Sequence, residues 1–418
     1  MDDFSYKVMR PSFFLRIWKK IFSFETFFVL YLFAGRFKAD PRFAWFPVDL
    51  TILFMLLSLV SGYSLMIKSK MKLTWYKLST VLLYFLFAVW SIVTLAWAPF
   101  THYALDKALR ILTLVTWAYI GSALFIACDY RRVQRFYVLL VLFSFWITVE
   151  ALMSYFVKDY SEIIVKEILV NYIGVSRVIS MAFGILVITF FDQNKWIVKI
   201  FYIISISILF ITLLAIGGRG PFIASVIGII LILLLKISLK NVFHISGLFI
   251  VVVIMVVLFA DHLPMTTIYR LSIISEQPLG GMSIAGRLER IEGALKQFQE
   301  APVLGKGIGS FFYFYGDTNL KRDYPHNLLL EIASETGFVG ILFFFMLVFV
   351  VICKFPWKLI RSNSLYAVVA YLVINSFINA MVSGDIPDNR VMFAALGLMV
   401  GLASCYHQHT EKKHALAT

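Results

Sequence analysis

The sequence predicts an all-α membrane protein, a polytopic bundle of about twelve transmembrane helices, and three observations support this class. Hydrophobic residues make up 61% of the 418 residues and charged residues only 15%, against about a quarter in soluble domains. The mean hydropathy is +0.85. The sequence contains repeated apolar runs whose lengths are close to ~20 residues, the length that a helix needs to cross about 30 Å of hydrocarbon.

The apolar runs divide the chain into spans joined mostly by short loops. We expect these spans at residues 22–36, 49–66, 79–97, 109–127, 136–156, 176–191, 197–216, 221–236, 244–260, 338–354, 364–382 and 390–405. An even number of crossings places both ends of the chain on one side of the membrane. The prediction is a single membrane domain over residues 1–418, with one long outer loop at 261–337 that contains short helices.

The formal charge of +14 is explained by topology better than by nucleic-acid binding, because basic residues gather in cytoplasmic loops. Loops on the side of the termini carry Lys68, Lys70, Lys72, Lys77, Arg131, Arg132, Arg135, Lys236, Lys240, Lys354, Lys358 and Arg361. Loops on the other side carry Asp106, Asp159, Glu162, Asp385 and Asp388, although Arg36, Lys38 and Arg42 are exceptions there. This bias places the termini inside and the 261–337 loop outside, and we expect no nucleic-acid partner.

The only long polar interval, residues 286–340, is where we expect the chemistry. His326 follows Pro325, and residues 327–336 can begin a helix that leads into the next span. An imidazole titrates near ~6.5 and can accept a proton from a hydroxyl. The alternative is an ordinary loop or helix-capping histidine. Glu331 and Glu335 either orient this ring or face solvent.

Arg219 lies in the run Gly217-Gly218-Arg219-Gly220-Pro221, between two outer span ends. Arginine at membrane depth is costly and marks a candidate functional site. The glycines allow a tight turn, and Pro221 suits the first position of a new helix. Amides at that helix start, with a guanidinium, favour an anion. The alternative is an arginine whose side chain extends to the membrane interface.

Arg287 and Arg290 begin an amphipathic helix, on which their spacing places them on neighbouring turns. Each can reach a phosphate or pair with a nearby glutamate. Leu288, Ile291, Leu295 and Phe298 are expected to share the apolar face of this helix.

The turn at residues 302–309 carries glycine at alternate positions, Gly305, Gly307 and Gly309. It lacks the Gly-Lys-Ser/Thr of a Walker loop. We expect it to be a flexible turn that closes the loop over a site, rather than a phosphate-binding loop.

We expect no metal and no cofactor. His102 and His262 are isolated, and the sequence offers no Asp-x-Asp or His-x-x-x-His pair.

These motifs resemble the O-antigen ligase and polymerase family of bacterial integral-membrane glycosyltransferases. The resemblance rests on His326-Asn327 followed at fixed spacing by Gly337 and Gly340, and on Gly218-Arg219-Gly220 at an outer helix junction. A third element comprises Gly286-Arg287, Ala294-Leu295, Pro302, Gly305 and Gly307. Glu292 departs from the family pattern, where an aromatic residue is expected.

The resemblance implies transfer of a glycan from undecaprenyl diphosphate to an acceptor hydroxyl, on the periplasmic face of the bacterial inner membrane. The reaction would be inverting and metal-independent. His326 would activate the hydroxyl, Arg219 and Arg287 would hold the diphosphate with Arg290 nearby, and Asn327 and Glu331 would orient the histidine. The partners would be the lipid-linked glycan, membrane lipids, and an acceptor glycan or lipid A-core.

Within the family, the run Tyr324-Pro325-His326-Asn327 favours a polymerase, which extends a chain by repeat units. The alternative is a ligase, which moves the finished polymer onto lipid A-core. A transporter or flippase for lipid-linked oligosaccharide is a further alternative. Transporters usually place polar groups near the membrane midplane, whereas the polar residues here lie at one face. An inert scaffold subunit would leave His326 without a role.

Overall fold

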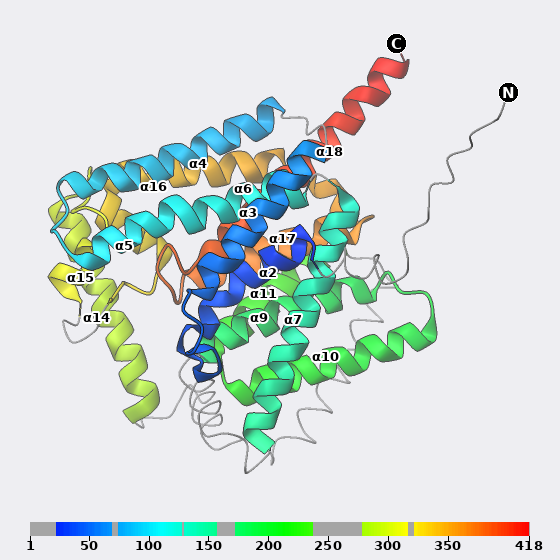
Figure 1. Cartoon of the computed structure of the whole chain (residues 1–418), viewed down its shortest axis with the longest axis horizontal. Helices are drawn as coiled ribbons and strands as arrows, with labels where there is room; N and C mark the ends of the chain where they lie inside the picture. The colour runs from blue at the N-terminus through cyan, green and yellow to red at the C-terminus, as the bar shows by residue number, and fades with distance from the viewer. Residues whose placement is uncertain are drawn as a thin grey trace.

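The computed structural model describes residues 22–68, 74–127, 129–156, 172–236, 278–316 and 322–417 (Figure 1). Every regular element within these ranges is helical, so the predicted all-α class is confirmed. Eight helices in the described part of the chain are long and apolar enough to cross a membrane, and α11 and α17 are shorter apolar helices. The chain is therefore a multi-pass membrane protein.

The helices before the polar interval are α2 (Phe24–Phe33), α3 (Leu50–Lys68), α4 (Trp75–Val93), α5 (His102–Arg110), α6 (Thr116–Gly121), α7 (Tyr130–Phe156), α9 (Tyr172–Phe190), α10 (Trp196–Ile216) and α11 (Arg219–Leu235). Two wider helical turns, η4 (Ile111–Val115) and η5 (Ser122–Ile126), make α5 and α6 one continuous span. The later helices are α14 (Pro278–Glu300), α15 (Ser310–Tyr315), α16 (Leu328–Lys354), α17 (Ser364–Ala380) and α18 (Arg390–Ala417). Short 3₁₀ turns occur at η1 (Ala34–Ala39), η2 (Pro41–Phe43), η3 (Thr94–Ala96) and η7 (Trp357–Ile360).

Each expected span within the described residues coincides with a helix. The span expected at 244–260 and loop residues 261–277 lie outside the described residues, so the total of twelve crossings stays a prediction. The first expected span contains α2 and the first residues of η1, and the 10 residues of α2 reach about half the hydrocarbon thickness. Of the exceptional outer cations, Arg36 and Arg42 share the carboxylate of Glu150 at 3.0 and 2.8 Å, so their charges are partly compensated.

The interior of the bundle is formed around α17, which packs against α9, α11 and α18 (Figure 1). Its side chains Tyr366 and Tyr371 are completely or almost completely buried. By contrast α3 exposes Ile52, Leu56, Val60 and Tyr63, the surface that lipid would cover. Apolar residues thus serve two purposes here, packing in the interior and contact with hydrocarbon on the outside.

The predicted helix at 327–336 is confirmed as the first part of α16, and a kink at Gly337 (φ 67°) separates it from the rest. Only glycine adopts this backbone conformation readily. The kink frees main-chain groups, and the glycine-rich turn bonds them: Gly307 N donates to Glu335 O at 2.8 Å and Phe338 N to Pro302 O at 2.8 Å. The turn therefore fastens the loop to α16, and these bonds occupy the amide of Gly307 that a phosphate would need.

The expected apolar face of α14 is wrong at two positions. Leu288 and Leu295 are 61% and 44% exposed, whereas Ala294 and Gln297 are completely buried. Gln297 donates to Ser310 Oγ at 2.6 Å on α15. The small residues of α14 allow the neighbouring helices to approach closely, so packing and a polar contact decide which face turns inward, rather than side-chain hydrophobicity.

Candidate active site

His326 lies in the loop before α16 and lines a cavity of about 380 Å³. It has a positive φ of 57°, an uncommon conformation outside glycine that often marks functional sites. Its ring centroid lies 4.5 Å from that of Tyr324. The buried Nδ1 atom has no hydrogen-bond partner within the described part of the protein, so no described residue uses its lone pair or proton.

Asn327 fixes the position of this loop. Its side-chain oxygen accepts a hydrogen bond from Leu330 N at 3.1 Å, capping α16, and its amide nitrogen donates to Met381 O at 3.2 Å. The residue expected to orient the imidazole is thus the N-cap and a link to the turn after α17. Any orienting effect acts through the backbone that Asn327 shares with His326.

The two cations of α14 act on the same loop. Arg290 binds Asp323 at 2.9 Å, so it pairs with the loop of His326 rather than with a glutamate of its own helix. Burial and the charges of Arg290 and Arg287, with a smaller effect of Arg177, lower the pKa of His326 to about 4, while Asp323 opposes them. The imidazole is therefore neutral at neutral pH and able to accept a proton.

Arg219 is the first residue of α11, after Gly217 ends α10 in the left-handed conformation (φ 71°). The tight turn expected here is confirmed, although Pro221 is the third helical residue rather than the first. A side chain at position 220 would meet Val382 at 2.9 Å. The start of α11 thus packs on the turn after α17 that Asn327 also contacts.

Glu331 faces neither solvent nor the imidazole. Its carboxylate binds the ammonium of Lys107 at 2.5 Å, and both side chains are fully buried. Glu331 Oε1 also accepts a hydrogen bond from Ile386 N at 3.2 Å. Glu331 is therefore part of a buried ion pair with Lys107. Any effect of Glu331 on His326 would be indirect, through the backbone of α16.

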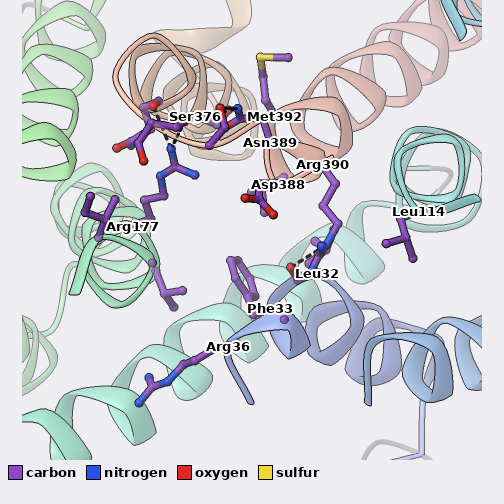
Figure 2. Close-up of a pocket in the computed structure, with 18 of the residues that line it drawn as sticks. Leu32, Phe33, Arg36, Leu114, Arg177, Ser376, Asp388, Asn389, Arg390 and Met392 are labelled. Atoms are coloured by element: carbon purple, nitrogen blue, oxygen red, sulfur yellow. Dashed lines mark hydrogen bonds between the residues drawn. The ribbon is translucent and has the colours of Figure 1, made fainter. Parts of the chain in front are cut away.

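The structure adds cations that the sequence reading missed. The cavity beside His326 is lined by arginines from several elements: Arg36, Arg110, Arg177, Arg322 and Arg390. Figure 2 shows Arg177 and Arg390 on either side of it. Arg177 lies inside the apolar run of α9, and a charge in such a run is the signal that would have identified it. Arg219, Arg287 and Arg290 are not among the described residues that line this cavity.

Residues 203–345 match the family model described as O-Antigen ligase. This segment includes Arg219, Arg287, Arg290 and His326. It is an O-antigen ligase family domain. The resemblance read from the motifs is confirmed for this segment, and the match supports an O-antigen ligase-type membrane enzyme. A comparison with curated proteins finds no match.

Proposed function

We propose that this O-antigen ligase-type protein transfers a glycan from undecaprenyl diphosphate to an acceptor hydroxyl at the periplasmic face of the inner membrane, with inversion and without a metal. The observation that carries the proposal is the environment of His326. A neutral imidazole with an unpartnered, buried Nδ1 lies at a cavity and within the field of Arg290 and Arg287.

In this mechanism His326 accepts the proton of the acceptor hydroxyl. The hydroxyl oxygen attacks the anomeric carbon of the donor sugar and forms the new glycosidic bond. The bond between that carbon and the diphosphate oxygen breaks, and the diphosphate leaves with the bonding electron pair. Attack from the face opposite the leaving group inverts the anomeric configuration.

Arg219, Arg287 and Arg290 would stabilise the departing diphosphate. Charge gathers on its oxygens as the bond breaks, and fixed guanidinium groups stabilise such charge without reorganisation. Hydrogen bonds to charged groups contribute about 1.5–3 kcal/mol each. Asp323 holds Arg290 at 2.9 Å, which positions its planar group before the substrate arrives.

Substrate binding and base strength would be coupled. The positive charges of Arg290 and Arg287 depress the pKa of His326 in the free protein. A diphosphate near these arginines offsets their charge, so its arrival raises the pKa of the imidazole toward the ordinary value. The histidine then becomes a stronger base when the donor is in place.

Within this chemistry we favour a polymerase, on the sequence context of His326, with a ligase as the alternative, and the matched family model does not distinguish the two. Glycan analysis of a deletion strain separates them. A polymerase predicts lipopolysaccharide with a single repeat unit on the core. A core without repeat units, together with accumulated lipid-linked polymer, would assign the ligase activity instead.

The metal-independent mechanism is tested on the purified protein in proteoliposomes. Transfer should continue in EDTA, and the anomeric configuration of the product should be opposite to that of the donor. Loss of transfer in EDTA with recovery on adding Mg²⁺ would exclude the metal-free mechanism, and retained configuration would exclude direct displacement.

A further inference from the structure

We propose that the cavity beside His326 is an anion subsite for the acceptor, in which Arg177 and Arg390 bind a phosphate or carboxylate group that the acceptor carries. This inference rests on the proposed function and adds to it a class of acceptor, an acidic glycan or a phosphorylated lipid.

The charge around the cavity is strongly unbalanced. Five arginines line it, and Asp388 is the carboxylate among the lining residues. Three of the arginines have carboxylate partners: Arg36 with Glu150 at 3.0 Å, Arg110 with Asp106 at 2.8 Å, and Arg322 with Asp388 at 3.1 Å. Arg322 also lies 3.5 Å from the buried carboxylate of Asp385, so Asp388 keeps part of its charge and acts on Arg177 as well. Arg177 and Arg390 are the two lining arginines that form no salt bridge with a described residue.

Those two groups, Arg177 and Arg390, donate to main-chain carbonyls. Arg177 Nη2 donates to Asn379 O at 2.9 Å and to Ser383 O at 2.5 Å. Arg390 Nε donates to Leu32 O at 3.1 Å. Neither forms a salt bridge within the described part of the chain, and the buried Nε of Arg177 has no partner there. Carbonyl dipoles offset part of the cost of burying a cation but leave its charge.

Both guanidinium groups border the same cavity. Arg177 extends from α9 and Arg390 from α18, on opposite sides of the cavity, while Arg36 points away toward the helix that carries Glu150 (Figure 2). The volume of about 380 Å³ is at the lower end of the ~300–1,000 Å³ of small-ligand sites. A cavity of this size can hold an anionic group and the sugar that carries it, but not a long glycan chain.

The position of His326 assigns this cavity to the acceptor. The donor diphosphate is proposed to lie at Arg219, Arg287 and Arg290, which do not line the cavity. A general base must reach the proton that it removes, so the acceptor occupies the space that the imidazole faces. In this arrangement Arg287 and Arg290 of α14 would bind the donor diphosphate and Arg177 would bind the anionic group of the acceptor. His326 would lie between the two substrates.

Anion binding is tested on the purified protein in detergent, with inorganic phosphate and glucuronate as probes. Thermal unfolding is followed against probe concentration at constant ionic strength, set with chloride. Wild type should be stabilised, and the probe that binds more tightly identifies the anion as phosphate or carboxylate. Arg177→Gln and Arg390→Gln should weaken the apparent Kd about tenfold or more. Equal affinity in wild type and these variants would overturn the proposal.

Arg361→Gln is the matched control, because Arg361 is exposed and also donates to a main-chain carbonyl, Leu235 O at 3.1 Å. Its Kd for both probes should equal that of wild type. If a glutamine variant does not fold, Arg177→Lys or Arg390→Lys replaces it. Lysine keeps the charge but not the planar fork, so the Kd should weaken by about threefold or more. An unchanged Kd in the lysine variants would contradict the proposal.

Kinetics in proteoliposomes distinguish acceptor from donor. Arg177→Gln and Arg390→Gln should raise KM for the acceptor about tenfold and leave KM for the donor unchanged. A rise in donor KM alone would assign the cavity to the donor diphosphate and refute the acceptor assignment. If wild type bound the probes but transferred no glycan, the proposed function would fail while the anion subsite stood.

Discussion

The ammonium of Lys107 on α5 lies 2.5 Å from Glu331 Oε1 and 2.5 Å from Glu335 Oε2 on α16, and all three side chains are fully buried. Ile386 N also donates to Glu331. This ion cluster therefore joins α5, the first part of α16 and the turn before α18, directly behind the loop of His326. Two carboxylates share one cation, so removal of that cation leaves both uncompensated.

Lys107→Met should strongly destabilise the protein. Breaking a buried ion pair by removing one partner costs about 3–5 kcal/mol, because the remaining charge is desolvated without compensation. The measurement is thermal unfolding in detergent. Lys306→Met is the control, since Lys306 pairs with the partly exposed Glu300 and such surface pairs contribute about 0–1 kcal/mol. Equal losses in the two variants would mean that the buried cluster is not stabilising.

Gly337→Ala should disturb the joint between α16 and the glycine-rich turn. The glycine has φ 67°, and an added Cβ would meet Val303 O at 2.3 Å, so both strain and a steric clash oppose alanine. A non-glycine residue in such a region costs about 1–3 kcal/mol, which a lower Tm should report. Gly286→Ala is the control: its backbone is helical, and the added Cβ would meet only the flexible end of Arg290, at 3.2 Å, so its Tm should change little. A Tm of the Gly337 variant equal to wild type would argue against a strained kink.

The helices were predictable because hydropathy and length are local properties, and the residues after His326 predicted the helical start of α16, although not its kink at Gly337. The Lys107 cluster was not, since Lys107 and Glu335 are 228 residues apart and nothing local marks such a pair. Glu331 was taken for a possible orienting group for the same reason. Its partner, Lys107, is on α5, and only the three-dimensional structure shows that the two side chains are in contact.

In the candidate site, too, some residues could be predicted from local sequence and others only from the packing of distant helices. His326, Arg287 and Arg290 were proposed from motif and spacing, and in the structure the charges of the two arginines act on the imidazole. Arg177 and Arg390 were counted as parts of spans, because their proposed role depends on a cavity to which α2, α9 and α18 all contribute residues. The face of α14 was mispredicted because close packing at Gly293 and the contact of Gln297 with Ser310 depend on α15, which the pattern of α14 alone does not reveal.

His326→Ala should reduce glycan transfer in proteoliposomes by about 10²–10⁴-fold, the usual contribution of a general base, with little change in Tm. His102→Ala is the matched control, because His102 is exposed at the start of α5, and its activity should equal that of wild type. Full activity in the His326 variant would remove the catalytic proposal.

Arg219→Lys and Arg287→Lys should each lower kcat about tenfold or more, because a point charge does not replace a planar, bidentate donor at a diphosphate. Single-turnover rates with the lipid-linked donor provide the measurement. Arg361→Lys, on an exposed turn, should retain the wild-type rate. If lysine at either position supported that rate too, the arginine would act as a general charge and not as a diphosphate ligand.

The pH dependence of transfer should reflect the low pKa of His326, which burial and the charges of Arg290 and Arg287 hold at about 4. The neutral imidazole is the active base, so activity is present above this pKa and lost as the pH falls through it. We expect kcat/KM, which reports the free enzyme, to stay level down to about pH 5, where an ordinary histidine of pKa ~6.5 would be mostly protonated. Arg290→Gln removes a positive charge and should shift the acidic limb to higher pH. Two results would contradict this assignment of the base. One is a wild-type kcat/KM that already falls near pH ~6.5, and the other is an acidic pKa of the profile that Arg290→Gln does not change.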